Sequence, residues 1–157
     1  MLFTGQSEAT IDQKERLAIP SKYRSQWQAA RDGQAWMCVP WPGSVLRLYT
    51  ENRFVALANQ VSGNLAPDED QAALDVTLFS NAERLEMDAT GRVRIPKRHL
   101  DLLGLGSEVI VAGARDRLEV HDRATWQAKE KERWSGLPSL VAKIEAKRVG
   151  GGPTSST

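Results

Sequence analysis

Two aspartate–arginine pairs with the same spacing could give this chain an anion-binding site. Asp12 is followed by Arg16, and Asp88 by Arg92, with three residues inside each pair. An aspartate at a turn accepts hydrogen bonds from backbone amides and from a guanidinium. An arginine held in this way can bind a phosphate or a guanine edge through two parallel hydrogen bonds, which a lysine cannot. Pairs of this kind also act as structural braces, so both interpretations stay open.

Other basic residues surround the two pairs. Lys14 lies inside the first motif, and Arg94 alternates with the apolar Val93 and Ile95, so Arg94 should point outward from a strand. Phosphate contacts from such residues would fix the register of a nucleic acid without specifying its sequence. Four more basic residues follow the two motifs: Lys22, Arg24, Lys97 and Arg98.

The motifs belong to an internal repeat. Residues 12–20 and 88–96 share Asp, Arg, Ile and Pro at matching positions, and residues 44–50 resemble 116–122. Two copies are too few for a solenoid, so we expect a duplicated domain.

The sequence of each copy predicts the same order of a strand, a short helix and a hairpin. These elements would hold the Asp–Arg motif in place. A strand with alternating apolar residues ends at Pro20 or Pro96, and a short helix begins there because proline is tolerated in a first turn. Gly104 should end the second of these helices. Thr50 and Asp122 are expected N-caps of the helices that close each copy. The expected hairpin strands are Trp36–Val39 with Val45–Tyr49, and Val109–Ala112 with Arg117–His121.

A linking helix over residues 68–79 should bury Leu74, Leu78 and Phe79, and Leu140 with Ile144 predict a last helix. Each half is marginal in size and has strand edges that need partners. Interlocked halves forming one β-barrel or sandwich with peripheral helices would solve both problems, so the expected fold is α+β and mainly β. The expected segments are 5–52 and 81–124 for the two modules, 53–80 for the linking helices, 125–149 for C-terminal helices and 150–157 for a disordered tail.

Composition excludes several other classes. The net charge of the 157 residues is only +1, so any DNA site must come from local clustering of charge. No apolar run could span a bilayer, and the first residues lack a signal sequence, which predicts a cytoplasmic protein. Cys38 is the single cysteine, and with His99 and His121 it matches no metal-ligand spacing. We therefore expect no metal, no cofactor, no small-molecule substrate and no enzyme activity.

Taken together, the motifs resemble the MraZ family over about residues 1–133. The segments that carry the resemblance are Phe3-Thr4-Gly5, Asp12 to Arg24, Leu78 to Glu83, Asp88 to Pro96, Val111 to Gly113 and Asp116 to Asp122. The resemblance implies two AbrB-like swapped-hairpin modules packed into one pseudo-symmetric unit. It also implies a ring-shaped homo-oligomer, an octamer or dodecamer, that binds double-stranded DNA at short direct repeats upstream of the division and cell-wall gene cluster. The family signature of Asp, three residues and Arg, together with the neighbouring basic residues, leads us to expect DNA contacts from Asp12, Lys14, Arg16, Arg24, Asp88, Arg92 and Arg94. The resemblance also implies a nucleoid-associated regulator.

One position departs from the family pattern. The residue before the motif arginine is usually glycine, as at Gly91, but the first copy has Glu15. If this position needs a positive φ, a non-glycine residue costs about 1–2 kcal/mol. Glu15 also adds a negative charge where phosphate would approach. We expect weaker DNA binding, with an oligomeric interaction module that has lost its operator as the alternative. An antitoxin relative of the same fold is a further alternative, which the duplication disfavours.

Overall fold

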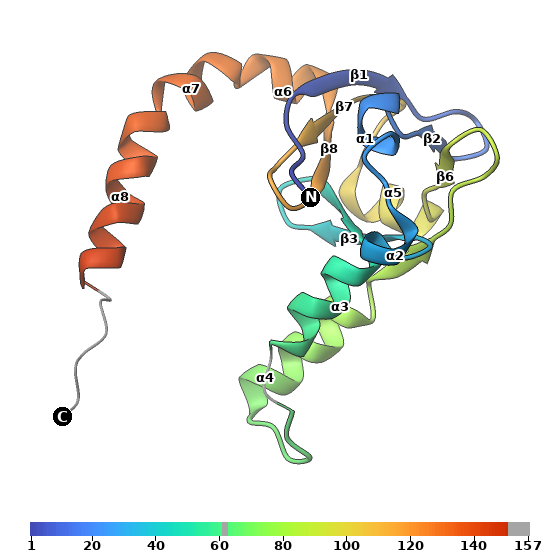
Figure 1. Cartoon of the computed structure of the whole chain (residues 1–157). Coiled ribbons are helices and arrows are strands. Elements are labelled where there is room, and N and C mark those ends of the chain that lie inside the picture. The colour runs from blue at the N-terminus through green and yellow to red at the C-terminus, as the bar shows by residue number, and fades with distance from the viewer. Residues whose placement is uncertain (61–62, 151–157) are drawn as a thin grey trace. The chain divides into compact units, whose positions relative to one another are not determined.

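The computed structural model describes residues 1–60 and 63–150 (Figure 1). They fall into two units, Met1–Ala124 and a unit that begins at Thr125. The first repeat holds β1 (Gln6–Thr10), β2 (Arg16–Ala18), α1 (Ser21–Arg24), α2 (Ala29–Asp32), β3 (Trp36–Trp41) and β4 (Val45–Thr50). The linking helices are α3 (Glu51–Asn59), α4 (Glu69–Leu74) and the π-helical turn η1 (Asp75–Phe79). The second repeat holds β5 (Glu83–Leu85), β6 (Arg92–Arg94), α5 (Lys97–Leu103), β7 (Glu108–Gly113) and β8 (Leu118–Asp122).

The two repeats exchange strands. The main sheet has six strands in the order β1-β7-β8-β4-β3-β5, and its mapped pairs are antiparallel. Each repeat's first strand, β1 or β5, therefore pairs with the hairpin of the other repeat. The order is symmetric about the contact between β8 and β4. The described pairs leave β1 and β5 as the edges of this sheet, so they trace no closed barrel.

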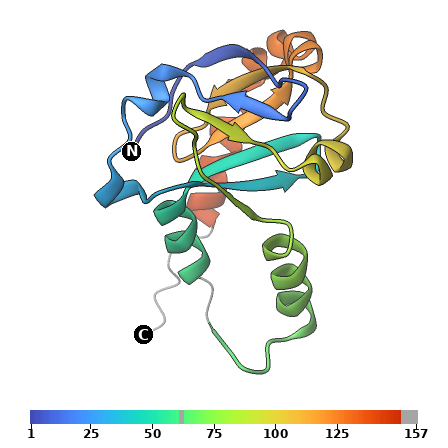
Figure 2. The ribbon, with the colours of Figure 1, turned by 90° about the vertical axis from the view of Figure 1, so that its right-hand side faces the viewer.

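A separate two-stranded ribbon joins the repeats a second time. β2 pairs antiparallel with β6, with Leu17 opposite Val93 (Figure 2). Both of these residues are fully buried. The ribbon thus packs one face on the core and turns its other face outward.

The alternation of apolar residues explains the predicted hairpins. β4 buries Leu46 and Leu48 while Val45, Arg47 and Tyr49 are only partly covered, and β7 buries its β-branched run from Val109 to Val111. Both hairpins are therefore confirmed. Gly113 is required at the end of β7, because a Cβ there would collide with the backbone of Phe3 and Thr4.

Two helix signals are also confirmed, and a third helix differs in length. The Thr50 hydroxyl accepts a hydrogen bond from the backbone N–H of Arg53 at 3.3 Å and caps α3. Gly104 adopts a left-handed conformation at the end of α5, with φ of 61°. The helix that follows Pro20 is shorter than the apolar spacing suggests, because α1 ends at Arg24 and leaves Trp27 outside it.

The linking segment differs from the expected helix. It begins near the expected place, but it is a short α-helix followed by a π-helical turn, which shifts the apolar face. The ring of Phe79 packs edge-on against Phe54 of α3, with centroids 5.8 Å apart. The prediction that Leu74 is buried is wrong, since its exposed fraction is 46%. Within the first unit, these helices extend away from the sheet (Figures 1 and 2).

The second unit consists of helices. It contains most of α6 (Arg123–Ala128), then α7 (Glu130–Ser135) and α8 (Leu137–Gly150), so the expected last helix is present. The guanidinium of Arg133 lies 3.8 Å from the ring centroid of Trp126 and donates to the Trp126 carbonyl. The expected disordered tail lies, apart from Gly150, outside the described residues. No helix in the described ranges is long and apolar enough to cross a membrane.

Candidate nucleic-acid interface

The first motif is a tight turn built around Asp12. One carboxylate oxygen of Asp12 accepts from the backbone amides of Lys14 and Arg16, both at 2.9 Å. The other oxygen accepts from Nε of Arg16 at 2.8 Å. The strand that follows is thereby fixed relative to the turn, and the guanidinium of Arg16 is held in one orientation.

The second motif repeats this geometry. Asp88 accepts from the backbone amides of Thr90 and Arg92, both at 2.9 Å, and from Nε of Arg92, also at 2.9 Å. The Thr90 hydroxyl adds a further bond at 2.8 Å. In both copies the aspartate binds Nε, and the described residues show no bond to the terminal nitrogens of Arg16 or Arg92. These nitrogens are the pair that a phosphate or base edge would need.

The carboxylates of both motifs are stabilised in their charged form. The backbone amide of Arg16 holds the pKa of Asp12 below its ordinary value, with smaller help from the Arg16 guanidinium. The backbone amide of Arg92 likewise depresses the pKa of Asp88, with the Thr90 hydroxyl contributing. Both aspartates therefore stay ionised at neutral pH and continue to accept hydrogen bonds from Nε of the two arginines.

The ribbon brings the two motifs together. Arg16 lies opposite Arg94, and Arg92 lies opposite Ala18. Residues directly opposite each other in an antiparallel pair point to the same face. Since Leu17 and Val93 occupy the buried face, the three arginines share the outward one, and the expectation that Arg94 points outward is confirmed.

Three acidic residues balance these arginines. Like charges directly opposite each other destabilise a ribbon. Asp12 and Asp88 neutralise part of the charge, and Oε2 of Glu15 lies 3.6 Å from Nη2 of Arg94. The contact crosses between the repeats, since the backbone carbonyl of Glu15 also accepts from the N–H of Ile95 at 2.8 Å. The sequence alone does not predict this pairing between the repeats, because it depends on the register between β2 and β6.

The two motif turns use the same unusual backbone conformation. Glu15 has φ of 59° and Gly91 has φ of 79°. The position before the motif arginine therefore has a positive φ in both copies. Glu15 adopts a conformation that favours glycine. Gly91 adopts this conformation without the strain that a side chain adds.

Arg24 is arranged differently from the other candidates. Its Nε donates to the carbonyl of Ile19 at 2.8 Å, and its side chain covers Gly91 so closely that a Cβ there would collide with it. Arg24 thus supports the second motif turn from the first repeat. Lys14 remains on the exposed tip of the first turn.

The cysteine and one histidine form a buried contact elsewhere. Sγ of Cys38 lies 3.4 Å from Nδ1 of His99, and both residues are fully buried in the core. Burial raises the pKa of the Cys38 thiol and lowers the pKa of His99, which keeps both groups neutral. Cys38 is therefore a packed residue of the core. Within residues 1–60 and 63–150, no group of three or more potential metal ligands occurs.

Fold and ribbon together define a duplicated α+β protein whose repeats exchange strands and pair their arginine motifs. Comparison with known sequences agrees. The family described as "MraZ protein, putative antitoxin-like" matches residues 78–139. A protein of Nitrosomonas eutropha named "Transcriptional regulator MraZ" is 30% identical over 125 residues, which cover 80% of this chain and 84% of that protein. A protein of the same name from Mesoplasma florum is 28% identical over 144 residues, covering 92% and 96%. The chain therefore belongs to the MraZ family.

Proposed function

We propose that this protein is a sequence-specific DNA-binding transcriptional regulator of the MraZ type, and that the β2–β6 ribbon is its DNA contact. The observation that carries the proposal is the antiparallel pairing of the two motifs, which gathers Arg16, Arg92 and Arg94 on one outward face. β-Ribbons of this width fit the major groove of DNA. The family relatives bear the name of a transcriptional regulator, which supports the same conclusion.

The geometry suggests distinct roles for the candidate residues. Arg16 and Arg92, each held through Nε, have terminal nitrogens for a base edge or a phosphate. Arg94 and Lys14 are exposed at the rim and suit phosphate contacts. Asp12 and Asp88 orient the arginines, and Arg24 supports the second turn.

The finer features of the proposal come from the family resemblance. The repeats form AbrB-like swapped-hairpin modules, and the symmetric strand exchange supports this assignment. Several copies assemble into a ring, an octamer or dodecamer, that binds short direct repeats upstream of the division and cell-wall gene cluster. Because one chain offers only a few phosphate contacts, tandem binding by several subunits would raise a modest affinity. The protein would then work in the cytoplasm, associated with the nucleoid.

A second candidate function rests on the ion pair between Glu15 and Arg94. That contact, added to the two motif aspartates, leaves the outward face with three arginines and three acids. A ribbon with so little excess positive charge attracts phosphates weakly. The alternative is therefore an oligomeric interaction module of the same fold with weakened or lost DNA binding.

Fluorescence anisotropy distinguishes the two functions. The labelled probe is the DNA upstream of the protein's own gene, compared with a scrambled probe at several salt concentrations. A regulator binds the first probe selectively, and Arg16→Ala or Arg92→Ala weakens binding about tenfold or more. Arg115→Ala is the control, because this arginine is exposed and lies outside the ribbon. Equal or absent binding to both probes by a folded oligomer would support the interaction module.

A further inference from the structure

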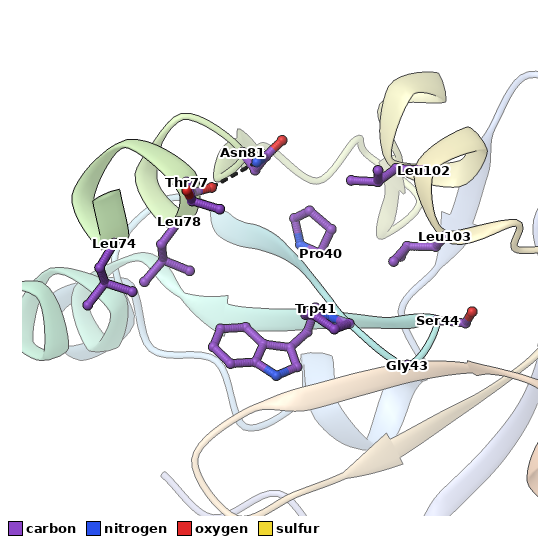
Figure 3. A pocket seen from close by; sticks show the side chains of 11 residues that line it. Pro40, Trp41, Gly43, Ser44, Leu74, Thr77, Leu78, Asn81, Leu102 and Leu103 are labelled. Atoms are coloured by element: carbon purple, nitrogen blue, oxygen red, sulfur yellow. Dashed lines mark hydrogen bonds between the residues drawn. The ribbon is translucent and has the colours of Figure 1, made fainter. Parts of the chain in front are cut away.

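An apolar groove lies on the first unit, away from the ribbon residues. Its volume is about 530 Å³, and it runs between the linking helices and α5, with the β3–β4 turn at its base (Figure 3). Leu74 and Leu78 line one side, Leu102 and Leu103 the other, and Pro40 and Trp41 lie between them. Leu102 is 63% exposed and Leu74 46%. Apolar surface of this kind on a folded domain marks a binding site.

Helix α8 carries an apolar stripe that matches such a groove. Leu137, Leu140, Val141 and Ile144 follow the spacing i, i+3, i+4, i+7 and so share one helix face. All four are exposed, with fractions from 46% to 57%. This spacing is the one by which a helix places anchors in an apolar groove.

One border of the groove is opposite in charge to α8. The groove is bordered by the segment 68–79, which carries Asp68, Glu69, Asp70 and Asp75 and has no lysine or arginine. Helix α8 carries Lys143, Lys147 and Arg148 against a single acidic residue, Glu145. Complementary charge at the border of an interface speeds association and fixes the register of the partners.

We propose that α8 of one copy of this chain docks its apolar stripe into the groove of a second copy. The stripe would be buried between α4–η1 and α5, with its basic end beside the acidic segment. Each copy offers one helix and one groove, so the contact is heterologous, and repeated head to tail it would link copies into the ring of the proposed function. The inference extends the proposed ring by naming its contact, but it concerns assembly without DNA. Its failure would leave the proposed DNA contact untouched.

Cross-linking of mixed chains tests the docking directly. One chain carries Leu102→Cys, and a second chain with a mass tag carries Ile144→Cys; a short bismaleimide links thiols that lie close together. The native Cys38 is fully buried and should not react. We expect a cross-linked heterodimer of tagged and untagged chains. Val55→Cys replaces Leu102→Cys as the control, because Val55 is exposed on α3 outside the groove.

Light scattering on the full-length chain supplies the second measurement. Ile144→Asp and Leu74→Asp should each reduce the assembly towards the 17.4 kDa monomer, with the circular dichroism unchanged. Ser139→Asp on the opposite face of α8 and Val55→Asp should leave its mass unchanged. A heterodimer yield equal to that of the control would overturn the proposal. So would linking found only when both cysteines are in one chain, or full assembly of the two groove and stripe variants.

Discussion

Replacing Glu15 with glycine should strengthen DNA binding and raise stability together. The substitution removes a negative charge that lies 3.6 Å from Arg94 on the proposed DNA face. It also relieves a non-glycine residue at φ of 59°. The two effects have separate physical causes, so they can be measured separately.

Their magnitudes can be estimated from Coulomb's law and from the cost of a positive φ. A carboxylate about 6 Å from a phosphate repels it by about 0.7 kcal/mol at the dielectric constant of water. Removing this repulsion at the first motif should raise the affinity of each chain for DNA roughly threefold. Releasing the positive φ contributes about 1 kcal/mol, and the added chain entropy of glycine in the unfolded state offsets about half of that. The exposed ion pair with Arg94 contributes little to stability. The free energy of unfolding should therefore rise by about 0.5 kcal/mol.

Anisotropy titration and chemical denaturation measure the two effects, and Glu15→Gln is the matched control. Glutamine removes the charge and keeps the strained backbone, so it should tighten DNA binding by about the same factor without raising stability. Gly91→Glu places the same charge in the second motif, where its Cβ also meets the Arg24 side chain, and should weaken binding. Unchanged or weaker DNA binding by Glu15→Gly would refute the electrostatic reasoning.

Three further predictions concern stability. Thr50→Ala should lower the free energy of unfolding by about 1 kcal/mol, measured by urea denaturation, because the hydroxyl caps α3. Gly91→Ala should cost about 1–2 kcal/mol, and Arg24→Ala in the same chain should recover part of it, because the Arg24 side chain covers that site. A hydrogen bond from His121 lowers the pKa of Glu119 from 4.5 to about 2. The stability that Glu119 contributes, on the order of 3 kcal/mol, should be complete above pH 4.5 and lost as pH falls towards 2, and Glu119→Gln should flatten this acid dependence of the melting temperature.

The hairpins and caps could be predicted because their signals are local. Alternating apolar residues define β4, a continuous β-branched run defines β7, and Gly104 ends α5. The strands β1 and β5 gave no such signal. Gln6–Thr10 is largely polar, and it becomes a strand because β7 supplies its hydrogen-bond partners. Its structure depends on tertiary pairing, which a single sequence does not display.

Each Asp–Arg turn of the candidate site could be predicted from the sequence, but the contacts between the two turns could not. The Asp–Arg spacing predicts the turn and the bond between the side chains, because both lie within five residues. The position of Arg24 over Gly91, and of Glu15 beside Arg94, depends on the register between β2 and β6. The linking helix was misjudged at Leu74, since a π-helical turn changes which residues share a face.

The exchange of strands between the repeats also decides when the protein can fold during its synthesis. Gln6 pairs with Ala112, more than a hundred residues later. Strand β1 of the first repeat cannot pair until the ribosome has synthesised β7 of the second repeat. Contacts of such long sequence separation slow folding and leave strand edges open until late. A nascent chain that stops before β7 therefore exposes β1 without its native partner, and such truncated products should be the ones that chaperones and proteases recognise.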